Sequence, residues 1–69
     1  MDLFTPYPVA RRVVVNTKTG RAFNAVLWRK RRGYLVLRDV ELLKPGAERV
    51  RMDGEVVIDR SNVDFLQVV

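Results

Sequence analysis

Residues 13–43 read VVVNTKTGRAFNAVLWRKRRGYLVLRDVELL, and this stretch decides the fold. Its runs of Val, Leu and aromatic residues are interrupted by two turn signals, at residues 16–20 and 29–33. Such runs suit the pleated, half-buried surface of a sheet, and turns this short join antiparallel neighbours. The stretch therefore predicts a three-stranded antiparallel meander. Its second turn begins with four cations, which we call the basic tip: Arg29, Lys30, Arg31 and Arg32.

On either side of this stretch the pattern continues as short strands. We expect strands at residues 11–17, 21–29, 34–43, 49–58 and 63–69. The fourth is interrupted at Asp53-Gly54, which is either a tight hairpin or a bulge in one long bent strand. Five short strands with tight turns predict a small antiparallel barrel that is closed or nearly closed, because closure removes unpaired edges.

One face of each strand should supply the core. In the second strand Phe23, Ala25 and Leu27 share a face by the two-residue period of a strand. The small Ala25 between two large side chains suggests a tight bend over a small core. The core is expected to include Phe23, Leu27, Leu35, Leu37, Val56, Ile58 and Leu66.

The composition bounds both stability and chemistry. A chain of 69 residues makes one domain, and a domain of this size buries only about 60% of the surface that its unfolded chain exposes. Cysteine and histidine are absent, which excludes disulfides, thiolate metal sites and Ser-His-Asp or Cys-His catalytic sets. We therefore expect a non-enzymatic protein with no cofactor and no metal, stabilised by oligomerisation. The net charge of +5 favours a polyanionic partner, with general solubility as the alternative.

The first ten residues, MDLFTPYPVA, differ from the rest of the chain. Pro6 and Pro8 forbid a regular helix and favour an extended backbone. Residues 1–10 are therefore expected to form an extended arm on the barrel or on a neighbouring subunit, with a frayed terminus as the alternative. Residues 11–69 would be the barrel domain. No run approaches the ~18 apolar residues of a membrane span, and the start lacks a signal-peptide pattern, so we expect a cytoplasmic protein without membrane contact.

Three segments resemble the Sm-like family, which includes the Sm and LSm proteins and the bacterial RNA chaperone Hfq. They are GRAFNAVL (residues 20–27), LVLRD (residues 35–39) and IDRSNVDFL (residues 58–66), and the match covers nearly all of residues 13–69. The resemblance implies an all-β, small five-stranded and strongly bent antiparallel barrel of the SH3-like barrel class, here without the family's usual N-terminal helix. It also implies a ring-shaped homo-oligomer that binds RNA.

The loops that read RNA in the family differ in this sequence. The loop after the second strand usually carries an Asp and a Met-Asn or similar pair, whereas here it is the basic tip. The second loop usually carries Arg-Gly-Asn, of which only Asn62 clearly survives. We therefore expect low sequence specificity. Divergent small members of this fold are similar to bacteriophage-encoded proteins. A bacteriophage origin is therefore an alternative, and the protein would then be located in the host cytoplasm or the virion.

The basic tip is the candidate binding site. Arginine binds phosphate and stacks on bases, and the flanking aromatic residues Trp28 and Tyr34 offer stacking platforms. A solvated turn with Trp28 packed on a neighbour is the alternative. The residues predicted to bind RNA or DNA are Arg29, Lys30, Arg31, Arg32, Tyr34, Arg60 and Asn62.

Two apolar strands near the C-terminus are the candidate contacts between subunits. They lack the Lys or Pro residues that protect an edge strand, so each can pair with a second copy of the chain. The predicted interface residues are Val56, Val57, Ile58, Val63, Phe65 and Val68. Two functions stay open, a ring-forming nucleic-acid-binding module and a structural or assembly protein that uses the same barrel for protein–protein contacts.

Overall fold

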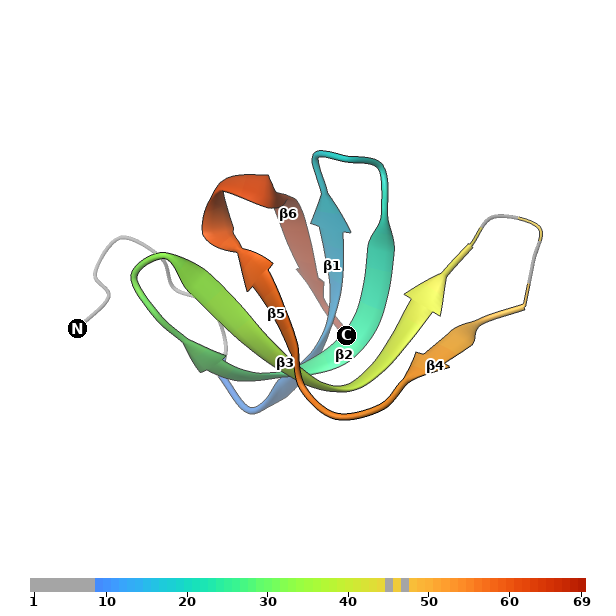
Figure 1. The fold of residues 1–69 in the computed structure, drawn as a ribbon, viewed down its shortest axis with the longest axis horizontal. Coiled ribbons are helices and arrows are strands. Elements are labelled where there is room, and N and C mark those ends of the chain that lie inside the picture. The colour runs from blue at the N-terminus through green and yellow to red at the C-terminus, as the bar shows by residue number, and fades with distance from the viewer. Residues whose placement is uncertain (1–8, 45, 47) are drawn as a thin grey trace.

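The computed structural model describes residues 9–44, 46 and 48–69, and the strands in this part of the chain form one strongly bent antiparallel sheet. The elements are β1 (Arg11–Thr17), β2 (Ala22–Lys30), β3 (Tyr34–Leu43), β4 (Val50–Met52), β5 (Val56–Asp59), the 3-10 turn η1 (Arg60–Asn62) and β6 (Val63–Val68). The sheet order is β4-β3-β2-β1-β6, and β5 pairs with β3 (Figure 1). The described residues contain no α-helix, so the all-β prediction is confirmed. Residues 1–8, most of the predicted N-terminal arm, lie outside the described residues.

The predicted meander is confirmed. β1 and β3 have the expected bounds, and β2 begins and ends one residue later than expected. The turn between β1 and β2 is closed by Thr17, which is buried and whose hydroxyl accepts a hydrogen bond of 3.0 Å from the backbone N–H of Arg21. Gly20 completes this turn with a φ of 86°, a conformation that costs glycine little because it lacks a Cβ.

The sheet bends where β2 and β3 fall out of register. Ala25 alone faces Asp39 and Val40 of β3, so β3 carries one extra residue at this point. Asp39 takes a left-handed φ of 52°, the conformation found at the first residue of one common type of β-bulge. The side chain of Ala25 is fully buried, in agreement with the tight bend that its small size predicts. Figure 1 shows β2 and β3 curving together.

The fourth predicted strand is divided into β4 and β5, and both parts pair with the same strand. Met52 pairs with Val40, and Val56 pairs with Leu37, so residues 53–55 face only two residues of β3. The bulge interpretation is therefore confirmed, and the hairpin interpretation is wrong because a hairpin would pair the two parts with each other. Gly54 supports the break with a φ of 76°.

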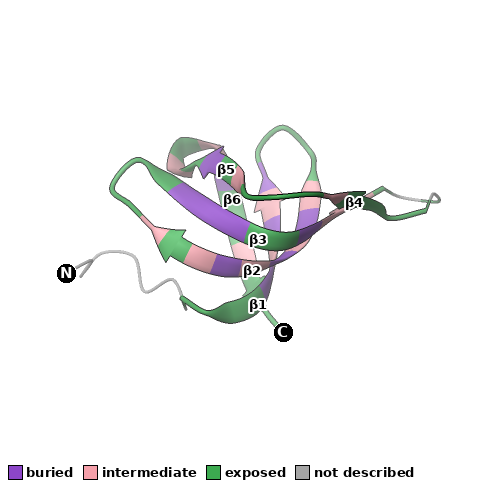
Figure 2. Cartoon of the chain, turned by 60° about the horizontal axis from the view of Figure 1, so that its bottom comes forward, coloured by how far each residue is buried: buried purple, intermediate pink, exposed green. Residues whose placement is uncertain are grey.

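The core lies inside the curve of the sheet (Figure 2). Of the predicted core residues, Phe23, Leu27, Leu35, Leu37 and Ile58 are buried. The other two, Val56 and Leu66, are partly buried and pack against the core. The buried cluster consists of Val13, Val15, Phe23, Ala25, Leu27, Leu35, Leu37, Val40, Ile58 and Val63.

The barrel stays open between β5 and β6. The two strands follow each other through η1, yet β5 is paired with β3 and β6 with β1, and within the described residues neither is paired on its other side. Apolar side chains remain exposed on these strands, with 60% of Val57, 53% of Phe65 and 48% of Val68 accessible. The described chain therefore offers two unpaired edges, one formed by β4 and β5 and the other by β6.

Candidate nucleic-acid interface

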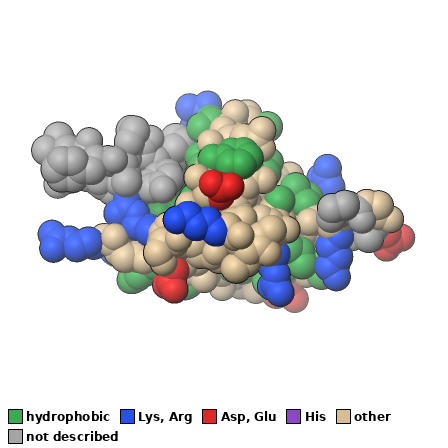
Figure 3. All heavy atoms as spheres, turned by 90° about the horizontal axis from the view of Figure 1, so that it is seen from above, with side chains coloured by type: hydrophobic (Ala, Val, Ile, Leu, Met, Phe, Trp, Pro, Cys, Tyr) green, Lys and Arg blue, Asp and Glu red, His purple; other side chains and the backbone are tan. Residues whose placement is uncertain are grey.

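The basic tip lies at one end of the molecule, where β2 turns into β3. The backbone N–H of Arg31 donates to the carbonyl of Tyr34 at 2.8 Å and closes the turn. Arg29, Arg31 and Arg32 are exposed, and Lys30 is half-buried. Figure 3 shows basic side chains protruding from the end of the molecule at which Figure 1 places this tip. The structure therefore holds four adjacent cations on a short, closed turn.

Arg60 of η1 fixes the backbone of this turn. Its guanidinium Nη1 donates to the carbonyl of Arg31 at 2.9 Å and to that of Arg32 at 3.1 Å. Its own backbone N–H donates to the carbonyl of Gly33 at 3.0 Å. The sequence predicts Arg60 as a direct contact to nucleic acid, and the structure places its guanidinium against the carbonyls of the tip.

The ion pairs of the described residues lie away from the basic tip. Among the described residues, the ion pairs join Arg12 and Arg51 to Asp39, Arg38 to Glu55, and Arg49 to Glu41. None of these pairs uses a carboxylate at the basic tip, and Arg29, Arg31 and Arg32 take part in none of them. The arginines around β4 are therefore paired with carboxylates of the chain, in contrast to these three arginines of the tip.

Asp39, at the bend of the sheet, pairs with two of these arginines at once. It accepts hydrogen bonds of 2.5 Å from both Arg12 and Arg51. The Arg12 and Arg51 guanidiniums lower the pKa of Asp39 below its ordinary value, because both hydrogen bonds favour the charged carboxylate. The same contact with Asp39 raises the pKa of Arg51.

The two aromatic residues beside the tip lie in different settings. Tyr34 begins β3 and is 40% exposed, so its ring is accessible for stacking. Trp28 is half-buried, and the guanidinium of Arg38 lies 4.0 Å from the centre of its ring. This cation–π contact, which the spacing of the residues in the sequence does not reveal, covers one face of the indole.

Asn62 lies apart from the basic tip. Its side-chain Nδ2 is 3.4 Å from the hydroxyl of Thr19, and its carbonyl accepts a hydrogen bond of 2.7 Å from the N–H of Lys18. These contacts place Asn62 against the turn between β1 and β2. Of the two predicted residues in the second loop, the structure therefore brings only Arg60 to the tip.

The predicted interface residues divide into two groups. Val57, Phe65 and Val68 are exposed, as a contact with a second subunit requires. Ile58 and Val63 are buried in the core of the chain itself, and Val56 is half-buried. The side chains of the second group therefore hold the strands in place, and their backbone forms the edges.

The described residues include no group of three His, Cys, Asp or Glu side chains that could hold a metal ion. In the same part of the chain, no helix is long and apolar enough to cross a membrane.

Comparison with solved structures shows that the fold is similar to that of Sm proteins. The chain superimposes on a heptameric archaeal Sm protein with a TM-score of 0.77 and 22% sequence identity, over 88% of this chain and 88% of that one. The chain has an Sm-like fold. The heptamer of SmAP1 from P. aerophilum is similar as well, with a TM-score of 0.76 and 22% identity over 88% of this chain and 81% of that one. No family model and no curated protein matches the sequence.

The Sm-like fold confirms the family resemblance at the level of architecture. In this fold the basic tip joins β2 to β3, and η1 joins β5 to β6, so the two loops predicted as binding loops meet through Arg60. At 22% identity the comparison shows a shared fold. What the loops bind has to be argued from their own chemistry.

Proposed function

We propose that this chain is a non-enzymatic, ring-forming module that binds single-stranded RNA or DNA through the basic tip, with low sequence specificity. One observation carries the proposal: the arginines at the tip lack carboxylate partners among the described residues, while those around β4 have them. Neighbouring unit charges in water repel by about 1 kcal/mol at 4 Å, and phosphate contact with release of counterions offsets that repulsion. A cytoplasmic location fits this function.

Low specificity is part of the proposal. Guanidinium and ammonium groups only donate hydrogen bonds, and they meet phosphates on every nucleotide alike. Arg60, which could have read a base edge, is occupied by carbonyls of the tip. Stacking on Tyr34 tolerates any base, because every base has a π-face.

The ring rests on the two unpaired edges. If β5 of one subunit pairs with β6 of the next, the contact is head-to-tail and repeats until it closes. The similar archaeal proteins are heptamers, which supports closure into a ring for this fold. Repetition would bring the basic tips of all subunits to one face and add their potentials.

The test is fluorescence anisotropy with labelled single-stranded RNA and DNA at low and moderate salt. Wild type should bind with an affinity that falls as salt rises. Arg31→Ala/Arg32→Ala should bind more weakly, with a salt slope smaller by about 0.7 for each phosphate that the variant no longer neutralises. The matched control is Arg49→Ala/Arg51→Ala, which removes the same charge where carboxylates already neutralise it.

Equal binding by wild type and the tip variant would contradict the proposal, as would wild-type binding without salt dependence. A structural or assembly protein would then be the better interpretation, because the exposed Val57, Phe65 and Val68 equally suit contacts with protein. A bacteriophage origin stays a prediction from the sequence.

A further inference from the structure

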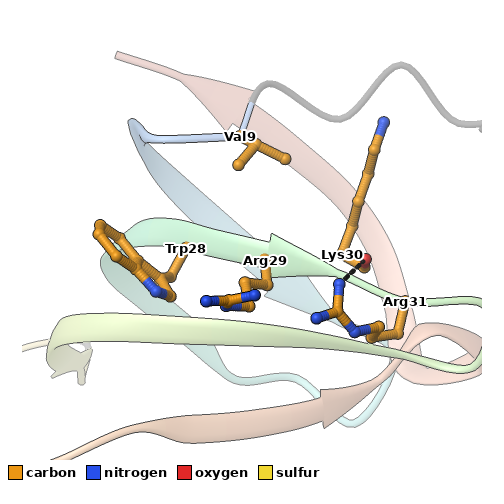
Figure 4. Close-up of a pocket in the computed structure, with 5 residues that line it drawn as sticks. All are labelled: Val9, Trp28, Arg29, Lys30 and Arg31. Carbon is orange, nitrogen blue, oxygen red and sulfur yellow. Dashed lines mark hydrogen bonds between the residues drawn. The ribbon is translucent and has the colours of Figure 1, made fainter.

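A groove beside the basic tip brings apolar, aromatic and cationic side chains together. It is an open groove between Val9, which precedes β1, and the end of β2, with a volume of about 320 Å³ (Figure 4). Sites for small molecules span about 300–1,000 Å³, so this groove suits one nucleotide and is too small for a folded partner. Its lining combines apolar and aromatic surface with three cations: Val9, Trp28, Arg29, Lys30 and Arg31.

A bulge in β2 explains why an aromatic residue and the cations line the same groove. In a regular strand Trp28 and Arg29 would point to opposite faces. Here the pairing with β3 shifts between Leu27 and Arg29, so Trp28 is an extra residue without a partner in the ladder. A bulge re-aims the side chains that follow it, and bulges are common beside functional sites. The consecutive residues 28–31 consequently all reach the groove.

The indole of Trp28 is held in a fixed orientation. Arg38 lies over its ring at 4.0 Å, and the Nε of Arg38 is anchored by the carboxylate of Glu55 at 2.7 Å. One face of the indole is therefore taken by a guanidinium that is itself held in place. A base can stack only on the other face, and an oriented ring loses little entropy when it does so.

The opposite wall of the groove is fixed as well. The backbone N–H of Ala10 donates to the carbonyl of Leu27 at 2.6 Å, which ties the segment before β1 to the end of β2. Ala10 has a φ of 65°, a strained conformation for a residue with a Cβ. Strain of this kind persists where the surroundings enforce it, and it is concentrated at ligand clamps. It places Val9 across the groove from the tip (Figure 4).

We propose that this groove is a subsite for one nucleotide of the bound single strand. The base inserts between Val9 and the free face of Trp28, and the phosphates on either side of it contact Arg29, Lys30 and Arg31. The inference rests on the proposed binding of nucleic acid. It adds that the bound strand runs along the end of β2 as well as over the turn. The polar groups of the described lining are all hydrogen-bond donors, which phosphates on every nucleotide can satisfy.

Trp28 is the only tryptophan of the chain, so its fluorescence reports on the groove directly. The probe is an unlabelled single strand of about ten nucleotides, within the ~4–16 nucleotides that single-strand-binding modules cover. Titration into wild type should quench and shift the emission of Trp28, with a midpoint equal to that of the anisotropy curve. If the emission stays constant while the anisotropy shows binding, the groove is not the nucleotide subsite, and the proposed function still stands.

Substitution of Trp28 gives the second measurement. Trp28→Leu should weaken binding by about 5- to 150-fold, the range for loss of one stacked base, and leave the salt slope unchanged. Trp28→Phe should keep most of the affinity because it keeps a stacking ring, and circular dichroism should show both variants folded. If Trp28→Leu binds as tightly as wild type, the groove is not the subsite. If wild type binds no single strand at all, the proposed function fails together with this inference.

Discussion

Leu37 is among the largest side chains that are fully buried in this small core. Replacing it with Ala removes three carbon atoms from a packed site and leaves a cavity that the surroundings fill only partly. Leu37→Ala should lower the free energy of unfolding by about 2–5 kcal/mol. The measurement is denaturant unfolding followed by circular dichroism, at one protein concentration because association also stabilises the fold.

The matched control at this position is Leu37→Met, which nearly conserves volume. It should lower the free energy of unfolding by less than about 1.5 kcal/mol. A loss for Leu37→Ala no larger than that of Leu37→Met would mean that the site is not packed as the structure places it.

Asp39 makes stability depend on pH. Its pKa is lowered by the hydrogen bonds from Arg12 and Arg51, so the folded chain holds this carboxylate charged at a pH where the unfolded chain would protonate it. This contribution is present above the unfolded pKa of about 3.9 and disappears as pH falls through the folded pKa. Wild type should therefore lose melting temperature on acidification below about pH 4.

Asp39→Asn should remove part of that acid sensitivity and lower the melting temperature at neutral pH. Asn tolerates the left-handed φ of 52° at this position, so the change acts on charge more than on backbone. The measurement is the melting temperature from neutral to acid pH, with the exposed Glu48→Gln as control. Parallel curves for wild type and Asp39→Asn would show that the two ion pairs contribute nothing to stability.

At the scale of elements, η1 and the basic tip act as one unit. Arg60→Gln removes a charged donor from the carbonyls of Arg31 and Arg32 and should let the turn open more often. The N–H of Arg31, bonded to Tyr34, reports this opening through hydrogen exchange. Exchange there should become roughly two- to tenfold faster, since a net hydrogen bond contributes about 0.5–1.5 kcal/mol.

The control for this prediction is the N–H of Lys18, which is bonded to Asn62 at the other end of η1. Its exchange should stay close to the wild-type rate, because the changed side chain does not reach the β1–β2 turn. Faster exchange at both positions would indicate general destabilisation, and an unchanged rate at Arg31 would show that Arg60 does not support the tip.

The elements themselves could be predicted from the sequence because period and turn chemistry are local. The bounds of β1 and β3 follow from alternating Val and Leu residues between turn signals. The division of the fourth strand could not be settled, since Asp53-Gly54 suits both a hairpin and a bulge. Only pairing with β3, a contact distant in the sequence, decides between them.

The charge cluster of the candidate site could be predicted from the sequence, whereas the arrangement of its side chains in space could not. Four adjacent cations are visible in the sequence, whereas the bulge at Trp28 depends on how β3 pairs opposite it. The bulge is also why Trp28 shares a groove with Arg29, the residue that follows it in the chain. The role of Arg60 depends likewise on η1 folding beneath the tip, which no local pattern indicates.

At the scale of the whole molecule, a thin core and two open edges favour association. A domain of 69 residues buries a smaller fraction of its unfolded surface than a larger domain does, so burial of its exposed apolar side chains between subunits would add to its stability. The edges of β5 and β6 differ from each other, so pairing between them is head-to-tail and ends in a closed ring or an open filament. If the chain forms such a ring, one charged residue introduced on either edge should disrupt the whole assembly.

Val57→Lys places a cation on β5, at a side chain that is 60% exposed in the single chain. If that surface is buried against β6 of the next subunit, the ammonium loses its water without gaining a partner, and the oligomer should dissociate. Val68→Lys should do the same from the other edge.

Sedimentation velocity and native mass spectrometry measure the outcome. The control is Tyr34→Lys, which places the same cation at a comparably exposed residue of β3, a strand that is paired on both sides, 40% against 48% for Val68. The control should assemble like wild type, and wild type that sediments as a monomer at high micromolar concentration would rule out the ring.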